Sequence, residues 1–484
     1  MRLDSETCYR AMKTHDARFD GRFFVAVRTT KIYCRPVCRV KTPYQENCTF
    51  YATAAAAEAS GYRPCLRCRP ELAPGNASVD ATGRIARAAA ALIDESLQNE
   101  SGLDEIASRL GITSRHLRRV FHDEFGVTPI AFAQTQRLLL AKQLIADTSL
   151  PLTEIAFASG FQSVRRFDAL FRQRYRLTPS TLRRAPDRKL PAESLCFKLS
   201  YRPPYDWAGM ISFLAPRTIA GVEEVTPSSY RRTIRVAHCA KWHSGWIEVA
   251  VEQQRNALRV HVSATLAKVV PAVLARVKQL FDLSCHPTEV SEALGELASE
   301  RPGLRVPGAA DGFEVAVRAI LGQQVSVSAA RTLAGRFAAA FGIRMPTPFA
   351  TLTHAFPNAQ EVAGLSPERI AEIGLPMARA RTISELAKAV DAGLLRLTAG
   401  IDVVEAIRIL KSLPGIGEWT AQYIAMRALA WPDAFPHTDL VVIKALGEKS
   451  SQKLLAAGEK WRPWRAYAVM HLWASAAQRN KKEG

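Results

Sequence analysis

Four of the nine cysteines form two closely spaced pairs, the first pattern in the chain that could do chemistry. Cys34-x3-Cys38 and Cys65-x2-Cys68 are two short clips that together supply four thiolates, a set that suits tetrahedral zinc. Most four-cysteine zinc sites only stabilise a small domain. A zinc-bound thiolate nevertheless stays deprotonated at neutral pH and can act as a nucleophile. The spacing therefore predicts a zinc site and leaves open whether that site is structural or reactive.

Basic residues flank both clips and could hold a DNA phosphate beside a reactive thiolate. These residues are Arg35, Arg39, Lys41, Arg63, Arg67 and Arg69. The segments 24–39 (FVAVRTTKIYCRPVCR) and 61–68 (GYRPCLRC) closely resemble the N-terminal zinc domain of the Ada family of adaptive-response regulators. Both the basic setting and the resemblance favour a reactive site.

The resemblance to the Ada family implies a role for each cysteine, although spacing alone does not distinguish the four. It implies that Cys34 irreversibly accepts a methyl group from a methylated DNA phosphate, while Cys38, Cys65 and Cys68 complete the zinc shell. Converting one thiolate to a thioether would change the charge of the site from about −2 to about −1. The weaker repulsion from phosphates would then tighten DNA binding.

A glycine turn followed by an aspartate is the second pattern that could do chemistry. Leu413, Gly415 and Gly417 belong to a Leu-Pro-Gly-Ile-Gly segment between two expected helices, and such a hairpin can present backbone N–H groups to a DNA phosphate. Asp439 follows, and a carboxylate near a sugar can stabilise the positive charge that develops when the C1′–N bond breaks. Asp439 could otherwise be a helix cap.

This pairing resembles the helix-hairpin-helix glycosylase superfamily, in which the position of Asp439 is that of the catalytic aspartate. Further segments across about residues 197 to 478 look like the alkyladenine glycosylase family AlkA. They are RPPYDW at 202–207, LFDL at 280–283, RPGLRVPG at 301–308, AILGQ at 319–323 and WRPWR at 461–465.

The AlkA resemblance implies that Phe213, Trp419, Tyr423 and Trp473 line a base pocket. Aromatic walls suit purines alkylated at N3 or N7, because these bases are cationic and stack well on electron-rich rings. The alternative is that Trp419 and Tyr423, four residues apart on a helix, are core packing.

Departures from related families refine the expected activity. Trp419 stands where bifunctional relatives have a Schiff-base lysine, which predicts base release without strand cleavage. No cysteine follows Cys285, which excludes the iron–sulfur cluster of some relatives. Gln324 replaces the leucine wedge of the AlkA motif, so the residue that fills the gap left by a flipped base is open. The Pro-Cys-His-Arg motif of the Ada methylguanine methyltransferase is missing, and we interpret Cys285 as structural.

A repeated helix-turn-helix pattern lies between the two candidate sites. Its first copy spans 103–119, with a turn at Gly111 and Ser114 as the expected N-cap, and its second copy spans 153–167. The repeat resembles the DNA-binding domain of AraC-type regulators, which also follows the zinc domain in the Ada family. The arginines expected to face DNA are Arg115, Arg118, Arg165 and Arg166. The alternative is a helical bundle with solvated basic faces.

The length and charge of the chain indicate how many domains it has and what kind of partner it binds. The 484 residues require several domains, and a net charge of +20 indicates a polyanion as partner. With no signal sequence and no long apolar run, we expect no membrane association and a cytoplasmic, nucleoid-associated protein. We predict a multidomain fold: a small α/β zinc domain, an all-α double helix-turn-helix, then an α+β glycosylase with a mostly helical body. The expected boundaries are 1–75, 80–185, a linker at 186–196, 197–290 and 291–484.

The combined prediction is a fusion protein for DNA alkylation repair and its regulation. One half would excise alkylated purines of the 3-methyladenine type, and the other would be a methylation-activated regulator that binds promoter DNA and contacts RNA polymerase. The alternative is a non-enzymatic DNA-binding regulator whose glycosylase half is inactive.

Overall fold

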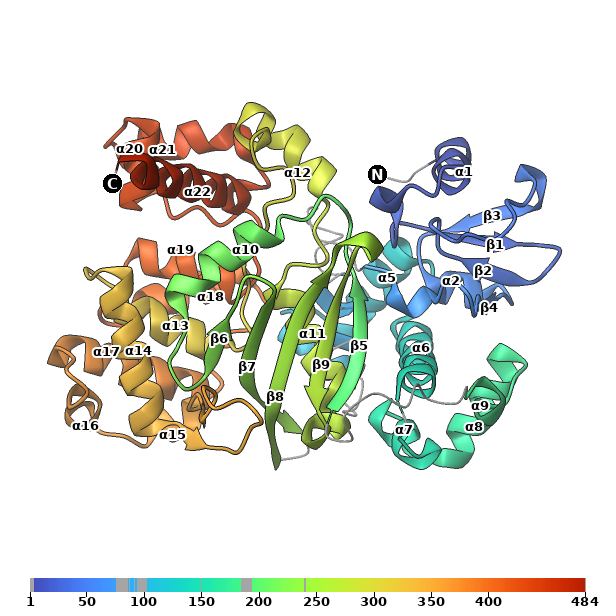
Figure 1. Ribbon diagram of the computed structural model, residues 1–484, viewed down its shortest axis with the longest axis horizontal. Coiled ribbons are helices and arrows are strands. Elements are labelled where there is room, and N and C mark those ends of the chain that lie inside the picture. The colour runs from blue at the N-terminus through green and yellow to red at the C-terminus, as the bar shows by residue number, and fades with distance from the viewer. Residues whose placement is uncertain are drawn as a thin grey trace.

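The computed structural model describes residues 4–74, 86, 88–90, 92–93, 102–148, 150–183, 194–238 and 241–483, with side chains described as far as residue 479. Figure 1 shows a small N-terminal domain, a helical region next to it, a central sheet, and a helical body on the other side of that sheet. This arrangement confirms the predicted multidomain fold class.

The N-terminal domain is built on a four-stranded sheet with the strand order β3-β1-β2-β4. Its main elements are α1 (Ser5–Lys13), β1 (Phe24–Val27), β2 (Ile32–Cys34), β3 (Cys48–Tyr51), α2 (Ala54–Ala59) and β4 (Arg63–Pro64). Strands β2 and β4 are parallel, with Tyr33 opposite Pro64, and the N–H of Cys65 donates to the carbonyl of Tyr33 at 3.0 Å. This register places the start of the second cysteine clip beside the start of the first.

Two helix-turn-helix units follow, joined by one long helix. The units are α4 (Leu103–Arg109) with α5 (Ser114–Phe125) and α7 (Leu152–Ala158) with α8 (Val164–Tyr175), and the joining helix is α6 (Pro129–Asp147). Gly111 and Gly160 form the turns at φ +67° and +83°, a region that glycine enters without strain.

The sequence repeat corresponds to a repeated buried aromatic pair and a repeated helix start. Phe121 and Phe125 have ring centroids 4.6 Å apart, and the rings at the repeated positions, 171 and 175, are 4.7 Å apart. Thr128 and Thr178 cap α6 and α9 (Pro179–Leu182), each followed by proline at the first helical position. The repeated residues therefore make the same packing contacts and the same helix start in both units.

The central sheet is antiparallel, with the strand order β5-β9-β8-β7-β6. Its strands are β5 (Ser194–Ser200), β6 (Glu223–Val225), β7 (Ser229–His238), β8 (Lys241–Glu252) and β9 (Ala257–Ser263), and α10 (Trp207–Leu214) lies between β5 and β6 in sequence. We expected a linker at 186–196, but 194–196 already belong to β5, and 184–193 lie outside the described residues.

The helical body holds the predicted hairpin. Its helices are α11 (Val270–Leu280), α12 (Pro287–Leu294), α13 (Gly312–Leu321), α14 (Val327–Phe341), α15 (Ala359–Ala363), α16 (Pro367–Ala371), α17 (Met377–Asp391), α18 (Val403–Ser412), α19 (Glu418–Arg427), α20 (Leu440–Leu446), α21 (Ser451–Gly458) and α22 (Arg465–Glu483). A short ladder pairs β10 (Ile343–Arg344) with β11 (His354–Ala355). The boundary that we expected between 290 and 291 falls inside α12.

Helix α6 is attached to the N-terminal domain by polar contacts. Lys142 pairs with Glu71 at 2.6 Å, and Asp147 accepts two hydrogen bonds of 2.7 Å from Arg69. The end of the N-terminal domain is thus attached to the helix that joins the two helix-turn-helix units. Among the described helices, none is long and apolar enough to cross a membrane.

Candidate functional site

The four predicted cysteines come together in one buried cluster. The sulfur atoms of Cys34, Cys38, Cys65 and Cys68 all lie within 4.8 Å of one another, and only Cys68 is more than slightly exposed. Hydrogen bonding to Cys38, Cys65 and Cys68, and then burial, hold the pKa of the Cys34 thiol well above its usual range. Four such thiols ionise together only when a cation compensates their charge, so the donor set fits a tetrahedral zinc ion.

Backbone hydrogen bonds divide the four sulfur atoms into two kinds. The N–H of Arg35 donates to Sγ of Cys68 and the N–H of Arg67 donates to Sγ of Cys65, both at 3.4 Å. Within the described residues, no backbone N–H donates to the sulfur of Cys34 or Cys38. A hydrogen bond to a thiolate stabilises its charge, so the backbone stabilises the sulfur atoms of Cys65 and Cys68 in this way.

Two of the six basic residues near the cluster form ion pairs with carboxylates of this chain. This corrects our expectation that all six could hold phosphate. Arg35 is buried and pairs with Asp20, while Arg69 pairs with Asp147 and Glu71. Arg35 neutralises the buried carboxylate of Asp20, and Arg69 neutralises the half-buried carboxylate of Asp147. The expected basic residues that remain exposed are Arg39, Lys41 and Arg67, and Arg63 is half-buried.

The four arginines predicted to face DNA are all exposed. Arg115 and Arg118 lie on α5, the second helix of its unit, and Arg165 and Arg166 lie on α8. We predicted Ser114 as the N-cap of α5, which is wrong. Thr113 caps this helix by accepting from the N–H of His116, and Ser114 is the first helical residue.

The predicted hairpin joins α18 to α19 and requires glycine at one position. Gly415 has φ +85°, and a Cβ there would lie 2.2 Å from Oγ1 of Thr382. Leu413 is the C-cap of α18, and Gly417 is the N-cap of α19 with open space where a Cβ would stand. The backbone N–H groups at the start of α19 are therefore accessible to an anion.

The four predicted pocket aromatics gather from three helices. Phe213 of α10 and Trp473 of α22 are parallel with centroids 6.1 Å apart, and Trp419 and Tyr423 of α19 are parallel at 5.1 Å. Tyr423 also contacts Trp473, at 6.2 Å. Trp419, Tyr423 and Trp473 are only half-buried, so this cluster is partly open, and Tyr423 and Trp473 also pack against the main hydrophobic core.

Asp439 is held at the edge of this aromatic cluster. Its Oδ2 accepts from Nε1 of Trp419 at 2.9 Å, and its Oδ1 accepts from Nε1 of Trp473 at 3.0 Å. Oδ1 also accepts from the N–H groups of Val441 and Val442, because Asp439 is the N-cap of α20. The cap that we considered as an alternative is present, and the same contacts fix the carboxylate beside the rings.

Family models match four consecutive segments of the chain, and the cysteine cluster and the aromatic cluster lie in different segments. The metal binding domain of Ada matches residues 7–71, a helix-turn-helix domain matches 106–185, the AlkA N-terminal domain matches 196–311, and the HhH-GPD superfamily of base excision DNA repair proteins matches 317–452. With the clustered cysteines, the first match identifies the N-terminal site as a zinc site.

One relative matches along nearly the full length. The probable bifunctional transcriptional activator/DNA repair enzyme AlkA of Mycobacterium tuberculosis is 38% identical over 494 residues, which covers 98% of this chain and 97% of the relative. The chain belongs to this bifunctional AlkA family. Its members combine the regulator and the repair enzyme in one polypeptide, as the four matched domains do here.

Other relatives cover separate halves. DNA-3-methyladenine glycosylase 2 of Escherichia coli is 38% identical over 57% of this chain and 96% of the relative. The bifunctional transcriptional activator/DNA repair enzyme Ada of Escherichia coli is 36% identical over 33% of this chain, and the match spans 43% of that relative. A 3-methyladenine DNA glycosylase from Archaeoglobus fulgidus, with a TM-score of 0.50 and 21% identity, covers 57% of this chain and 97% of its own and shows the same fold.

Gln324 of this bifunctional AlkA chain lies in the loop between α13 and α14, close in sequence to a contact with the hairpin. It is exposed and has φ +53°, an unusual backbone conformation for a residue with a side chain. Its neighbour Gln323 donates to the carbonyl of Gly415 at 2.9 Å and to Oγ1 of Thr420 at 3.0 Å. The loop that carries Gln324 is therefore tied to the hairpin.

Two arginines beside the aromatic cluster were missed by the sequence analysis. Arg217 and Arg427 place their guanidinium carbons 4.0 Å and 5.1 Å from the ring centroid of Phe213. Arg217 follows Phe213 by four residues, and Arg427 follows Tyr423 by four. On a helix this spacing puts a cation beside the ring, and it is the signal that could have found them.

Proposed function

We propose that the C-terminal half hydrolyses the C1′–N bond of alkylated purines of the 3-methyladenine type in duplex DNA. The observation that carries this proposal is the carboxylate of Asp439, which two indole N–H groups and two backbone N–H groups hold beside a partly open aromatic cluster. Such a fixed anion stabilises developing positive charge without having to reorganise.

The chemistry follows from the polarity of the bond that breaks. The electron pair of the C1′–N bond leaves with the base, and positive charge develops on the sugar beside Asp439. Water adds to C1′ and gives up one proton, for which the carboxylate is the nearest base in the proposed arrangement. Trp419 offers no amine to form a Schiff base, so the expected products are a free base and an intact strand with an abasic sugar.

Two aspartates that make the same helix cap allow a matched test. Asp402 caps α18 through Val404 N–H and Glu405 N–H, as Asp439 caps α20. Asparagine is also a good N-cap, so neither Asp439→Asn nor Asp402→Asn should disturb folding much. We expect Asp439→Asn to lower 3-methyladenine release at least about a hundredfold, and Asp402→Asn to keep it.

The result that would overturn the proposed role is base release by Asp439→Asn at the wild-type rate. A wild-type chain that binds DNA and releases no base would instead support the non-enzymatic regulator. Chromatography of released bases, with circular dichroism of each variant, separates these outcomes.

For the N-terminal site, we propose that Sγ of Cys34 attacks the methyl carbon of a DNA methylphosphotriester. A C–S bond forms, the methyl C–O bond breaks, and the electron pair stays on the phosphate, which becomes an ordinary phosphodiester. Zinc would keep the thiolate deprotonated at neutral pH. Family resemblance favours Cys34, and the lack of a backbone N–H donor to its sulfur within the described residues agrees with a nucleophilic role.

We further propose that the exposed arginines of α5 and α8 contact DNA in two successive major-groove segments. Arg115, Arg118, Arg165 and Arg166 lie on the second helix of each unit, where recognition helices carry their contacts. Methylation of Cys34 would make the zinc site less negative and tighten this binding. RNA polymerase is the proposed partner for activation, and promoter binding would make the protein nucleoid-associated.

A further inference from the structure

The aromatic cluster lies between one anion and two cations. Asp439 contacts the indole N–H groups of Trp419 and Trp473, and these rings stack on Tyr423 and Phe213 respectively. On Tyr423 and Phe213 lie the two guanidiniums. Arg427 donates to the hydroxyl of Tyr423 at 2.8 Å, and Arg217 and Arg427 both lie over the ring of Phe213.

Neither guanidinium is neutralised by a carboxylate within the described part of the chain. Arg217 donates to the carbonyl of Phe213 at 2.9 Å. Arg427 is buried and donates to the carbonyls of Pro307 and Gly308 at 2.8 and 3.1 Å. A guanidinium without a carboxylate partner costs free energy when it is removed from water. Arg217 is half-buried and Arg427 is buried, so two such groups beside one ring point to a functional role.

Burial and the nearby positive charges both shift the pKa values of two groups in the cluster. Burial, and then the positive charges of Arg427 and Arg318, lower the pKa of Arg217, although Tyr423 opposes this shift. Burial alone would raise the pKa of the Tyr423 hydroxyl, yet Arg427, Arg217 and Arg318 outweigh it and lower that pKa. The Tyr423 end of the cluster is therefore electropositive.

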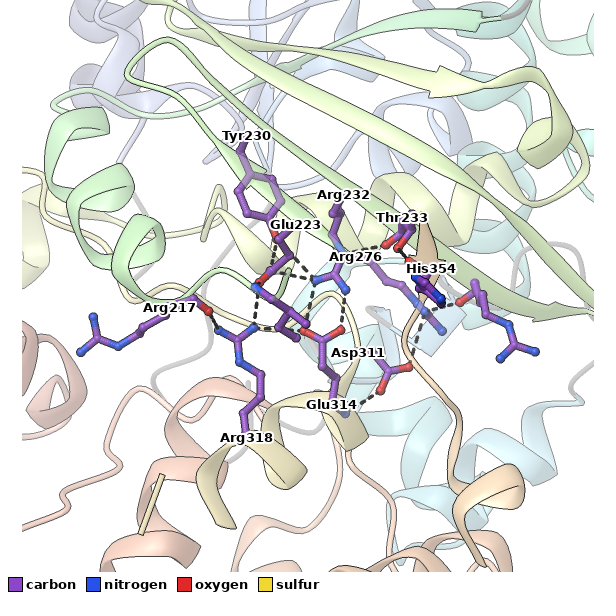
Figure 2. A network of polar contacts seen from close by, with 12 residues as sticks. Arg217, Glu223, Tyr230, Arg232, Thr233, Arg276, Asp311, Glu314, Arg318 and His354 are labelled. Atoms are coloured by element: carbon purple, nitrogen blue, oxygen red, sulfur yellow. Dashed lines mark hydrogen bonds and ion pairs between the residues drawn. The ribbon is translucent and has the colours of Figure 1, made fainter. Parts of the chain in front are cut away.

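A buried ion network holds Arg217 in place. Arg318 donates to the carbonyl of Arg217 at 2.5 Å and pairs with Glu223 at 3.2 Å and with Glu314 at 3.1 Å. Arg232 completes the network by pairing with both glutamates. Figure 2 shows the carbonyl of Arg217 facing Arg318, while its guanidinium points away from the network. The two arginines and two glutamates of the network neutralise one another, and the Arg217 guanidinium lies at the aromatic cluster instead.

We propose that Arg217 and Arg427 act on the departing base, as the electropositive counterpart of Asp439. This inference rests on the proposed glycosylase function and adds residues that set its substrate range. When the C1′–N bond breaks, negative charge moves from the sugar to the base. A carboxylate at the sugar and guanidiniums at the base both favour that movement.

The effect differs between two classes of base. A cationic base such as 3-methyladenine is repelled when it binds and becomes neutral as it leaves, so the guanidiniums weaken binding and speed cleavage. An uncharged base such as hypoxanthine binds without repulsion and leaves with negative charge, so the guanidiniums speed cleavage and hardly change binding. The two classes of base therefore separate the effect of the guanidiniums on binding from their effect on cleavage.

The test measures single-turnover cleavage with the full-length zinc protein and duplexes that carry one 3-methyladenine or one hypoxanthine. We expect Arg217→Gln to slow cleavage about tenfold on both substrates at saturating protein. The half-saturating protein concentration should fall about tenfold for the 3-methyladenine duplex only. Glutamine keeps an N–H donor for the carbonyl of Phe213. Arg217→Lys, which keeps the charge, should stay close to wild type on both substrates.

The control is Arg259→Gln, which removes one positive charge from an exposed position on β9 and should change neither parameter. If Arg217→Gln raises the half-saturating concentration for both duplexes, or if Arg217→Lys is as slow as Arg217→Gln, the proposal is wrong and Arg217 has a structural role. An unchanged Arg217→Gln also overturns it. A wild-type chain that releases neither base would overturn the proposed glycosylase function as well, whereas loss of the substrate difference alone overturns only this inference.

Discussion

The cysteine cluster and the aromatic cluster with Asp439, which is the proposed base pocket, are the two proposed reactive sites, but the chain assembles them differently. The cluster takes its ligands from residues 34–68, where β2 and β4 lie side by side. The pocket takes residues from 213 to 473, on α10, α19, α22 and the start of α20. The first site is a local motif, and the second exists only when distant helices pack.

This difference has a chemical counterpart in the proposed functions. A thiolate that accepts a methyl group is consumed, so the cluster acts once per protein molecule. A carboxylate that only stabilises charge is unchanged, so the pocket turns over. The proposed functions would therefore combine a methyl acceptor that acts once and an enzyme that turns over in the same chain.

The largest expected effect comes from replacing Cys34, the proposed methyl acceptor. Cys34→Ser should abolish methyl uptake from methylphosphotriester DNA, because a serine hydroxyl is not a thiolate. Base release from the distant pocket should continue near the wild-type rate. Mass spectrometry of the protein and chromatography of released bases measure the two activities in parallel. Methyl uptake at another cysteine of the variant would show that Cys34 is not the acceptor, and loss of base release would show that the sites are coupled.

Stability of the cysteine domain should depend on pH through Glu58. This carboxyl accepts from the hydroxyls of Tyr33 and Thr135, both at 3.0 Å, and burial raises its pKa from 4.5 to about 7 despite these bonds. The folded state therefore holds the proton more tightly than the unfolded state. The contribution of Glu58 to the free energy of unfolding should be largest below pH 4.5, fall as pH rises toward 7, and level off above it, by up to about 3 kcal/mol in total.

Glu58→Gln should remove that dependence, because the amide does not titrate and can still accept from one hydroxyl. Denaturant unfolding at pH 5 and pH 8, followed by reaction of the four cysteines with a thiol reagent, measures it. A variant with the same pH dependence as wild type would assign the effect to another group.

The region between the two sites should contribute affinity for DNA rather than chemistry. Replacing Arg165 and Arg166 together by alanine should weaken binding to a random-sequence duplex roughly tenfold and reduce the salt slope by about 2, because two phosphate or base contacts are lost. Arg172→Ala is the control, since Arg172 pairs with Asp168 at 2.9 Å on the same helix. A change in salt slope in the control that is half as large as in the double variant would mean that net charge alone matters.

The smallest expected effect concerns the loop beside the pocket. We expect the exposed side chain of Gln324 to fill the gap left by a flipped base, so Gln324→Ala should slow base release several-fold. Gln324→Asn should stay close to wild type, because asparagine tolerates a positive φ and keeps the amide. Equal rates for wild type and Gln324→Ala would mean that another residue fills the gap.

Sequence patterns could predict the parts of this molecule that are local. The cysteine spacing, the glycine turn at Gly111 and the Leu-Pro-Gly-Ile-Gly hairpin between two helices follow from rules that act over a few residues. The aromatic pocket was predicted only through a family resemblance, because no periodicity connects Phe213 to Trp473. The commitment of Arg35 to Asp20 and the guanidiniums beside Phe213 depend on tertiary packing, which a charge count does not reveal.

The measurement that tests the account most directly is one incubation of excess methylated duplex DNA with the full-length protein, followed over time. The account predicts free 3-methyladenine that accumulates well beyond one base per protein, together with a mass gain that stops at one methyl group on Cys34. Base release that stops at one per protein, or a mass gain that is absent or maps to another cysteine, would contradict it.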